Sequence, residues 1–133
     1  MSRNDARGGG LISADVSPEG IGVVIAKFPQ QPHGMTYEGT LIFANNGTTR
    51  RAVVSFTETG TTGIRDALLF DRHLARLAEN VGPLEGWMRD PYDASRMDPL
   101  MRNDADDEQY DHQFPDHPLT LVRAELARLQ RSL

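Results

Sequence analysis

The stretch TYEGTLIFANNGTTRRAVVSFT, residues 36–57, decides the fold. It holds two runs rich in β-branched and aromatic residues on either side of Asn46-Gly47, a dipeptide that readily takes the positive φ angles of a two-residue hairpin turn. With these two residues as the loop, one face of the hairpin carries the mostly apolar pairs Tyr37–Phe56, Gly39–Val54, Leu41–Ala52 and Phe43–Arg50. The other face carries the mostly polar pairs Thr36–Thr57, Glu38–Ser55, Thr40–Val53 and Ile42–Arg51. Turn chemistry and side-chain alternation therefore select the same register.

Two further strands are expected before this hairpin. Residues 11–16 are a weak strand candidate, and residues 17–20 (SPEG) have the composition of a tight turn. Residues 21–28 (IGVVIAKF) are apolar on both faces apart from Lys27, which is typical of an inner strand. The sequence therefore predicts a four-stranded antiparallel meander.

Two helices are expected after the sheet. The first, over residues 64–81, follows a loop in which Thr61 or Thr62 is the predicted N-cap. Its apolar positions are Ile64, Ala67, Phe70, Leu74, Leu77 and Val81. We expect this helix to cover the apolar face of the hairpin. The second helix starts at Pro118, with Asp116 or His117 as its cap, and carries the apolar stripe Leu119, Val122, Leu126, Leu129 and Leu133.

The chain of 133 residues reads as a single α+β domain over residues 1–133, in which the Gly-rich residues 1–10 are expected to be flexible. It contains no cysteine, which excludes disulfides, thiolate zinc sites and cysteine nucleophiles. There is neither an apolar signal segment near the N-terminus nor an apolar run of about 20 residues. A soluble cytoplasmic protein is therefore expected.

The negative charge is concentrated in one segment. Residues 82–118 hold ten acidic and three basic side chains, whereas the whole chain has a net charge of −5. Such a segment repels nucleic acid and anionic membranes, so neither is expected as a partner. It favours a basic protein partner instead.

Residues 84–117, the acidic segment, lack long periodicity yet carry many large apolar side chains, which predicts irregular structure held against the domain. Aromatic groups ringed by carboxylates suit a surface that docks a basic partner. The candidate partner-binding residues are Trp87, Tyr92, Asp104, Asp106, Asp107, Glu108, Tyr110 and Asp111. In the alternative interpretation, the aromatic groups pack against the sheet and only the acidic groups face water.

Two other chemistries have weaker support. The doubled Asp-His pattern of Asp111, His112, Asp116 and His117 offers metal ligands, but its spacing matches neither a zinc signature nor a calcium loop. Residues 58–63 (ETGTTG) precede a helix and could place N–H groups around an anion, but they lack the phosphate-loop pattern. No cofactor is expected.

Three functions follow from these features. The favoured one is a non-catalytic protein-binding module, most concretely a bacterial immunity or inhibitor protein that engages a basic toxin or effector through its acidic surface. The second is a secretion chaperone or adaptor that pairs with another chain through its C-terminal helix. A homodimer through the same helix is a further alternative. The third is a metal-dependent enzyme built on the Asp/His cluster.

Overall fold

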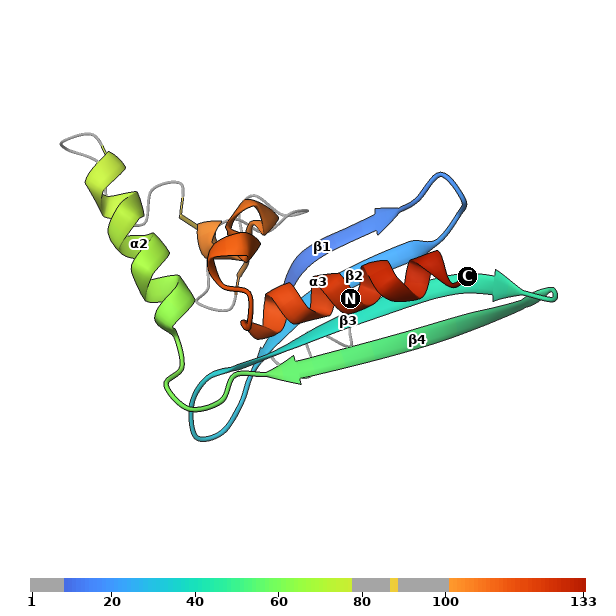
Figure 1. Ribbon diagram of the computed structural model, residues 1–133, viewed down its shortest axis with the longest axis horizontal. Coiled ribbons are helices and arrows are strands. Elements are labelled where there is room, and N and C mark those ends of the chain that lie inside the picture. The colour runs from blue at the N-terminus through green and yellow to red at the C-terminus, as the bar shows by residue number, and fades with distance from the viewer. Residues whose placement is uncertain (1–8, 78–86, 89–100) are drawn as a thin grey trace.

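The structure is a computed structural model, and it describes residues 9–77, 87–88 and 101–133. Four strands form one antiparallel sheet in chain order: β1 (Gly10–Val16), β2 (Gly22–Pro29), β3 (Met35–Asn45) and β4 (Thr48–Thr57). They are followed by helix α2 (Ile64–Arg76), the short 3-10 helices η1 (Asp104–Asp106) and η2 (Glu108–Gln113), and helix α3 (Pro118–Arg131). The predicted α+β fold with an antiparallel meander is confirmed (Figure 1).

The β3–β4 hairpin has the predicted register. Ten residue pairs run without a break from Thr36–Thr57 to Asn45–Thr48. Asn46 and Gly47 form the turn with φ angles of 53° and 78°. Positive φ at both central residues belongs to the type I′ turn, whose twist matches the twist of the flanking strands.

Strand β2 is an inner strand, as its apolar pattern predicts, and lies between β1 and β3. Strand β1 is short, and its register with β2 shifts between Leu11 and Ser13. This irregularity turns the intervening Ile12 into the core, where its side chain is fully buried.

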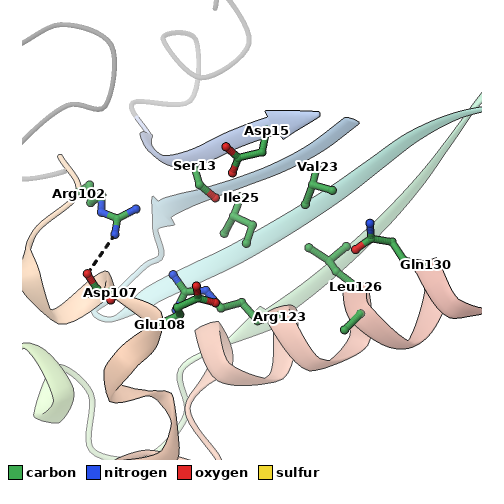
Figure 2. A pocket seen from close by; sticks show the side chains of 11 residues that line it. Ser13, Asp15, Val23, Ile25, Arg102, Asp107, Glu108, Arg123, Leu126 and Gln130 are labelled. Atoms are coloured by element: carbon green, nitrogen blue, oxygen red, sulfur yellow. Dashed lines mark ion pairs between the residues drawn. The ribbon is translucent and has the colours of Figure 1, made fainter. Parts of the chain in front are cut away.

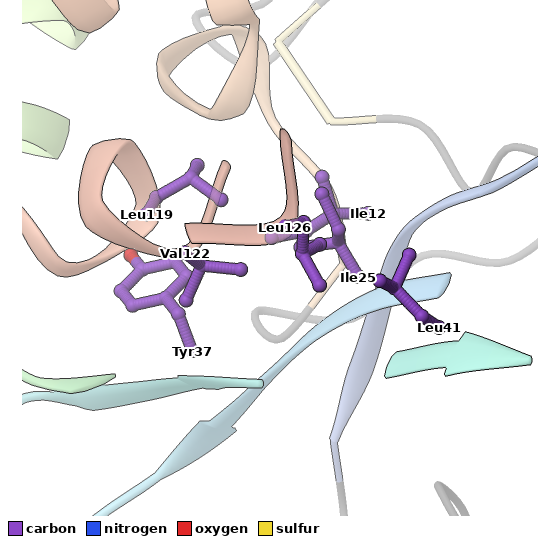
Figure 3. Packing of buried hydrophobic residues seen from close by; sticks show 7 residues of the cluster. All are labelled: Ile12, Ile25, Tyr37, Leu41, Leu119, Val122 and Leu126. Atoms are coloured by element: carbon purple, nitrogen blue, oxygen red, sulfur yellow. The ribbon is translucent and has the colours of Figure 1, made fainter. Parts of the chain in front are cut away.

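Helix α3 covers the apolar face of the sheet. Figure 3 shows Leu119, Val122 and Leu126 of α3 packed against the strand residues Ile12, Ile25, Tyr37 and Leu41. The helix passes directly over Gly39 of β3, where an added Cβ atom would lie 2.6 Å from Leu126 Cδ1 and 2.7 Å from Val122 Cγ1. Glycine at this position therefore sets how closely the helix approaches the sheet.

The helix predicted over residues 64–81 does form, with Val81 outside the described residues, but the prediction that it covers this face is wrong, and so are most of its predicted buried positions. It forms α2, which ends at Arg76 and lies at one end of the sheet beside η1 (Figure 1). Its buried residues are Arg65, Leu69 and His73, whereas Ile64 and Leu74 of the predicted stripe are exposed. The apolar pattern was misleading because the buried stripe contains an arginine and a histidine, whose polar groups find partners in the acidic segment.

The caps of the helices differ in how well they were predicted. Helix α2 is capped by Gly63 in the left-handed conformation with no side-chain bond, so the predicted threonine cap is wrong. Helix α3 has the predicted cap, because His117 Nδ1 accepts a hydrogen bond from the Leu119 N–H at 3.1 Å and Pro118 opens the first turn. Among the described residues, no helix is long and apolar enough to cross a membrane.

Candidate functional site

The acidic segment, where it is described, is folded onto the domain by short 3-10 helices. Asn103 caps η1, and its side chain accepts a hydrogen bond from the Ala105 N–H at 2.8 Å. In return, Asp106 Oδ2 accepts from the Asn103 N–H at 3.0 Å, which completes a capping box. This compact loop brings side chains of the segment into the interior.

Asp106, one of the predicted partner-binding residues, lies inside the protein. Its Oδ2 atom is 2.6 Å from Lys27 Nζ on β2, and both side chains are 1% exposed. Within the described part of the chain, Asp106 Oδ1 has no hydrogen-bond partner. The pair joins the acidic segment to the sheet, and Asp106 is not available to a partner protein.

Asp111, a second predicted partner-binding residue, is shared by two arginines. Its Oδ1 atom accepts hydrogen bonds from Arg65 Nη2 and Arg123 Nη1, each at 2.9 Å. Arg65 is buried and also donates to the Ala105 carbonyl at 2.6 Å and to the Asp107 carbonyl at 3.0 Å. Arg65 is therefore the centre that holds α2, η1 and η2 together.

The aromatic candidates also lie largely in the interior. Trp87 is 6% exposed, with its ring edge-on to Phe70 at 5.0 Å between centroids. Tyr110 is partly buried against the same cluster, which is built on α2 and η1 rather than on the sheet. Tyr92 falls outside the described residues. The tryptophan is thus a core residue of the α2 end of the molecule.

Burial changes the pKa of Asp66 in the first turn of α2. Burial raises it to about 6, helped by the negative charge of Asp106, while Lys27 acts in the opposite direction. Tyr37 responds to the same surroundings, because burial and the charge of Asp106 raise its pKa well above 10. A cluster of perturbed groups can mark a functional site, but structural ion-pair networks perturb pKa values in the same way.

The doubled Asp-His pattern does not form one cluster. Asp111 binds the two arginines, His112 and Asp116 are exposed, and His117 caps α3. Burial, together with the positive charge of Arg65, lowers the pKa of His117 to about 4. In the described ranges, no group of three or more histidine and carboxylate side chains is arranged to hold a metal ion.

In the predicted anion-binding loop, residues 58–63, the chain's own Glu58 carboxylate takes the place of an anion. Glu58 Oε1 accepts a hydrogen bond from the Met35 N–H, and its Oε2 accepts from the Gly63 N–H, both at 2.9 Å. The N–H group at the start of α2 is therefore occupied by an internal carboxylate. Glu58 fastens the loop after β4 to the start of β3.

An open groove lies between one side of α3 and the strands β1 and β2, with a volume of about 390 Å³ (Figure 2). Ser13, Asp15, Val23 and Ile25 of β1 and β2 form one wall, and Arg123, Leu126, Ala127 and Gln130 of α3 form the other. Arg102, Asp107 and Glu108 close one end.

The arginines of this groove are already engaged. Arg123 donates to Asp111, and Arg102 donates to the Ile12 carbonyl at 2.8 Å and lies 3.7 Å from Asp107. Among the described residues, neither Asp15 nor Glu108 forms an ion pair. Burial lowers the pKa of Arg123, and the negative charges of Asp111 and Glu108 oppose this shift. The unpaired charge of the groove is thus negative. The sequence predicted Asp107 and Glu108, but it gave no signal for Asp15, which comes from a strand about 90 residues earlier.

Comparisons with known protein families, with curated proteins and with solved structures give no match to this chain.

Proposed function

We propose that this chain is a non-catalytic protein-binding module that engages a basic partner through the groove between β1 and α3. A bacterial inhibitor or immunity protein for a basic toxin or effector is the concrete form of this proposal. The observation that carries it is the pair of carboxylates, Asp15 and Glu108, that have no ion-pair partner in the described chain.

The charge pattern of the groove favours a cation over an anion. An incoming guanidinium group would meet carboxylates while the resident arginines stay bound to Asp111, Asp107 and the Ile12 carbonyl. An incoming carboxylate would have to compete for arginines that are already satisfied. Complementary charge of this kind raises the rate of encounter and selects between partners.

The proposed surface is smaller than the acidic segment as a whole. Trp87 and Asp106 are buried, and Asp111 is bound to two arginines, so these residues support the fold. Asp104 is partly exposed on the α2 side, 3.9 Å from His73, away from the groove residues. The remaining carboxylates of the surface are Asp107 and Glu108, to which Asp15 is added.

Binding can be tested with a short tri-arginine peptide flanked by glycines and with the same peptide in which neutral citrulline replaces arginine. We expect the native chain to bind the arginine peptide, and the double variant Asp15→Asn/Glu108→Gln to bind it about fivefold more weakly, because two exposed ion pairs contribute about 1 kcal/mol. The variant Asp116→Asn/Glu125→Gln loses the same charge elsewhere on the surface and serves as the control.

Equal weakening in both double variants would show that only net charge matters and would remove the groove from the proposal. Equal binding of the arginine and citrulline peptides would remove the requirement for a cation. Calorimetry at two salt concentrations gives both comparisons, because exposed ion pairs weaken as salt rises.

The two alternative functions have less support. Most of the apolar stripe that motivated an adaptor function is covered, since Leu119, Val122 and Leu126 pack on the sheet, whereas Leu133 at its end is exposed. The side chains that motivated a metal-dependent enzyme have separate structural roles, since Asp111 binds arginines and His117 caps α3.

A further inference from the structure

The two edge strands of the sheet differ in how well they are protected. Strand β1 has seven residues, its register is interrupted near Ile12, and Arg102 donates a hydrogen bond to the Ile12 carbonyl. Strand β4 has ten residues, an unbroken register and no proline. Proteins usually blunt such edges with bulges, proline or very short strands, so β4 is the edge that is open to strand addition.

The residues of β4 are open to solvent along the whole strand. Every residue from Thr48 to Thr57 is exposed or half-exposed, and Val53 at its centre is 44% exposed. Within the described residues, β3 is the only strand that pairs with β4.

The hairpin register also fixes which backbone groups face outward. In a two-residue hairpin the closing pair, here Asn45 and Thr48, is hydrogen-bonded, and hydrogen-bonded pairs then alternate along the ladder. The even-numbered residues of β4 therefore bond to β3. The N–H and C=O groups of the odd-numbered residues point away from the sheet; they are Thr49, Arg51, Val53, Ser55 and Thr57.

We propose that β4 is a dimer interface, in which β4 of a second copy of this chain pairs with it in antiparallel orientation around a two-fold axis at Val53. In this register every outward-facing residue meets another outward-facing residue. Val53 faces Val53 of the second copy, and the flanking pairs are Arg51 with Ser55 and Thr49 with Thr57. The strand is thus complementary to itself, as a two-fold interface requires.

The charges and the apolar groups agree with this register. No arginine faces an arginine, and the exposed Val53 side chains contact each other on the face opposite α3. Glu38 lies opposite Ser55 on β3, so it shares a row across the extended sheet with Arg51 of the second copy. These opposite charges lie about two strand spacings, or about 10 Å, apart, so their long-range attraction adds a small preference for this register.

The helices leave room for the second sheet. Because α3 lies over both β3 and β4, the two copies of α3 would be separated by two to three strand spacings, or about 10–14 Å. Packed helices need only about 8–10 Å between their axes. The dimer thus forms one eight-stranded sheet with two α3 helices side by side on the same face.

The interface can be tested by sedimentation of the full chain with the variant Val53→Lys, which places two ammonium groups against each other at the axis. The control Ile42→Lys adds the same charge to the same face, but on β3 rather than at the edge. We expect the native chain and the control to sediment at twice 14.8 kDa and Val53→Lys at 14.8 kDa. A monomeric native chain, or a dimer that survives Val53→Lys, would overturn the proposal.

A second measurement tests the register directly, because the chain has no cysteine of its own. Val53→Cys would meet its own copy across the axis with Cα atoms about 5.5 Å apart, which suits a disulfide. Thr49→Cys, exposed on the same face, would face Thr57 instead. Under mild oxidation we expect a covalent dimer from Val53→Cys only. Cross-linking from both variants, or from Thr49→Cys alone, contradicts the register.

Discussion

At the scale of single residues, the ion pair between Lys27 and Asp106 is a buried contact that depends on both partners. Both side chains are 1% exposed, and they lie 79 positions apart in the sequence. Removing one partner from a buried pair leaves a charge that water cannot reach, whereas replacing both partners by neutral groups costs much less. The pair therefore fastens the acidic segment to β2 only while both charges are present.

The variant Lys27→Met should lower the free energy of unfolding by about 3–5 kcal/mol, because Asp106 is left buried without its cation. Adding Asp106→Asn to it should restore part of this loss, which chemical denaturation of the single and double variants can measure. As a control, Arg128→Ala breaks the exposed pair with Glu125 and should have little effect. If the double variant were as unstable as the sum of the two single variants, the two residues would not act as a pair.

Two buried groups give stability opposite dependences on pH. The pKa of Asp66 is raised to about 6 from 3.8, so the folded state holds a proton that the unfolded chain has lost, and stability falls as pH rises through this window. The pKa of His117 is lowered to about 4 from 6.5, so stability falls as pH drops through that window. The two effects overlap and partly cancel between about pH 4 and pH 6.

Each substitution should therefore expose the effect of the other residue. Asp66→Asn should raise stability above pH 6 by on the order of 2–3 kcal/mol and leave it unchanged below pH 4, since one pKa unit corresponds to about 1.4 kcal/mol. His117→Asn, which keeps a capping side chain, should remove the loss of stability at low pH. The remaining effect should be a decline of stability as pH rises. Denaturation curves measured from pH 4 to pH 8 test both. An Asp66→Asn gain that is the same at every pH would show that its carboxyl group is not buried as described.

At the scale of elements, the orientation of α2 separates what the sequence encodes locally from what it does not. The hairpin register and the cap of α3 were predictable because the residues that decide them are neighbours in the chain. The buried face of α2 was not predictable, because the partners of Arg65 are the carbonyl groups of Ala105 and Asp107, some 40 positions away. A helix with apolar groups on two faces gives no local indication of which face is buried.

Adjacent leucines of α2 test this orientation. Leu69 is 1% exposed beside Trp87 and Ala105, whereas Leu68 is 49% exposed. Leu69→Ala should cost about 2–5 kcal/mol of stability through the lost contacts and the cavity, while Leu68→Ala should stay within about 1 kcal/mol of the native chain. Thermal or chemical denaturation of the two variants gives the comparison directly. Similar losses in both would mean that α2 presents a different face to the interior.

The candidate site could also be predicted only in part, because its residues lie even farther apart in the sequence. Glu108 and Asp107 were singled out by the concentration of acidic residues, but Asp15 belongs to a strand with no chemical signature. Only the placement of α3, which lies mainly over β3 and β4 and leaves a groove beside β1 and β2, brings Asp15 and Glu108 to the same place. Conversely, Asp106 and Asp111 share the composition of the segment, yet they are drawn inward by Lys27, Arg65 and Arg123.

At the scale of the whole molecule, the acidic segment has two roles. Its carboxylates Asp106 and Asp111 pair with Lys27, Arg65 and Arg123, and these pairs join α2, α3 and the sheet. Its exposed carboxylates border a groove that α3 leaves open. The proposed partner surface on the β1 side and the proposed dimer edge at β4 lie at opposite edges of the sheet, so a dimer would present two grooves at once.

The central claim is that the groove between β1 and α3 binds a cation, and a nuclear magnetic resonance titration of the native chain with the tri-arginine peptide tests it most directly. We predict that amide shifts move for residues around Ser13, Asp15, Glu108 and Gln130, and that the citrulline peptide leaves them in place. Shifts that spread over all exposed carboxylates, or that gather around Asp104 and Asp116 instead, would contradict the claim.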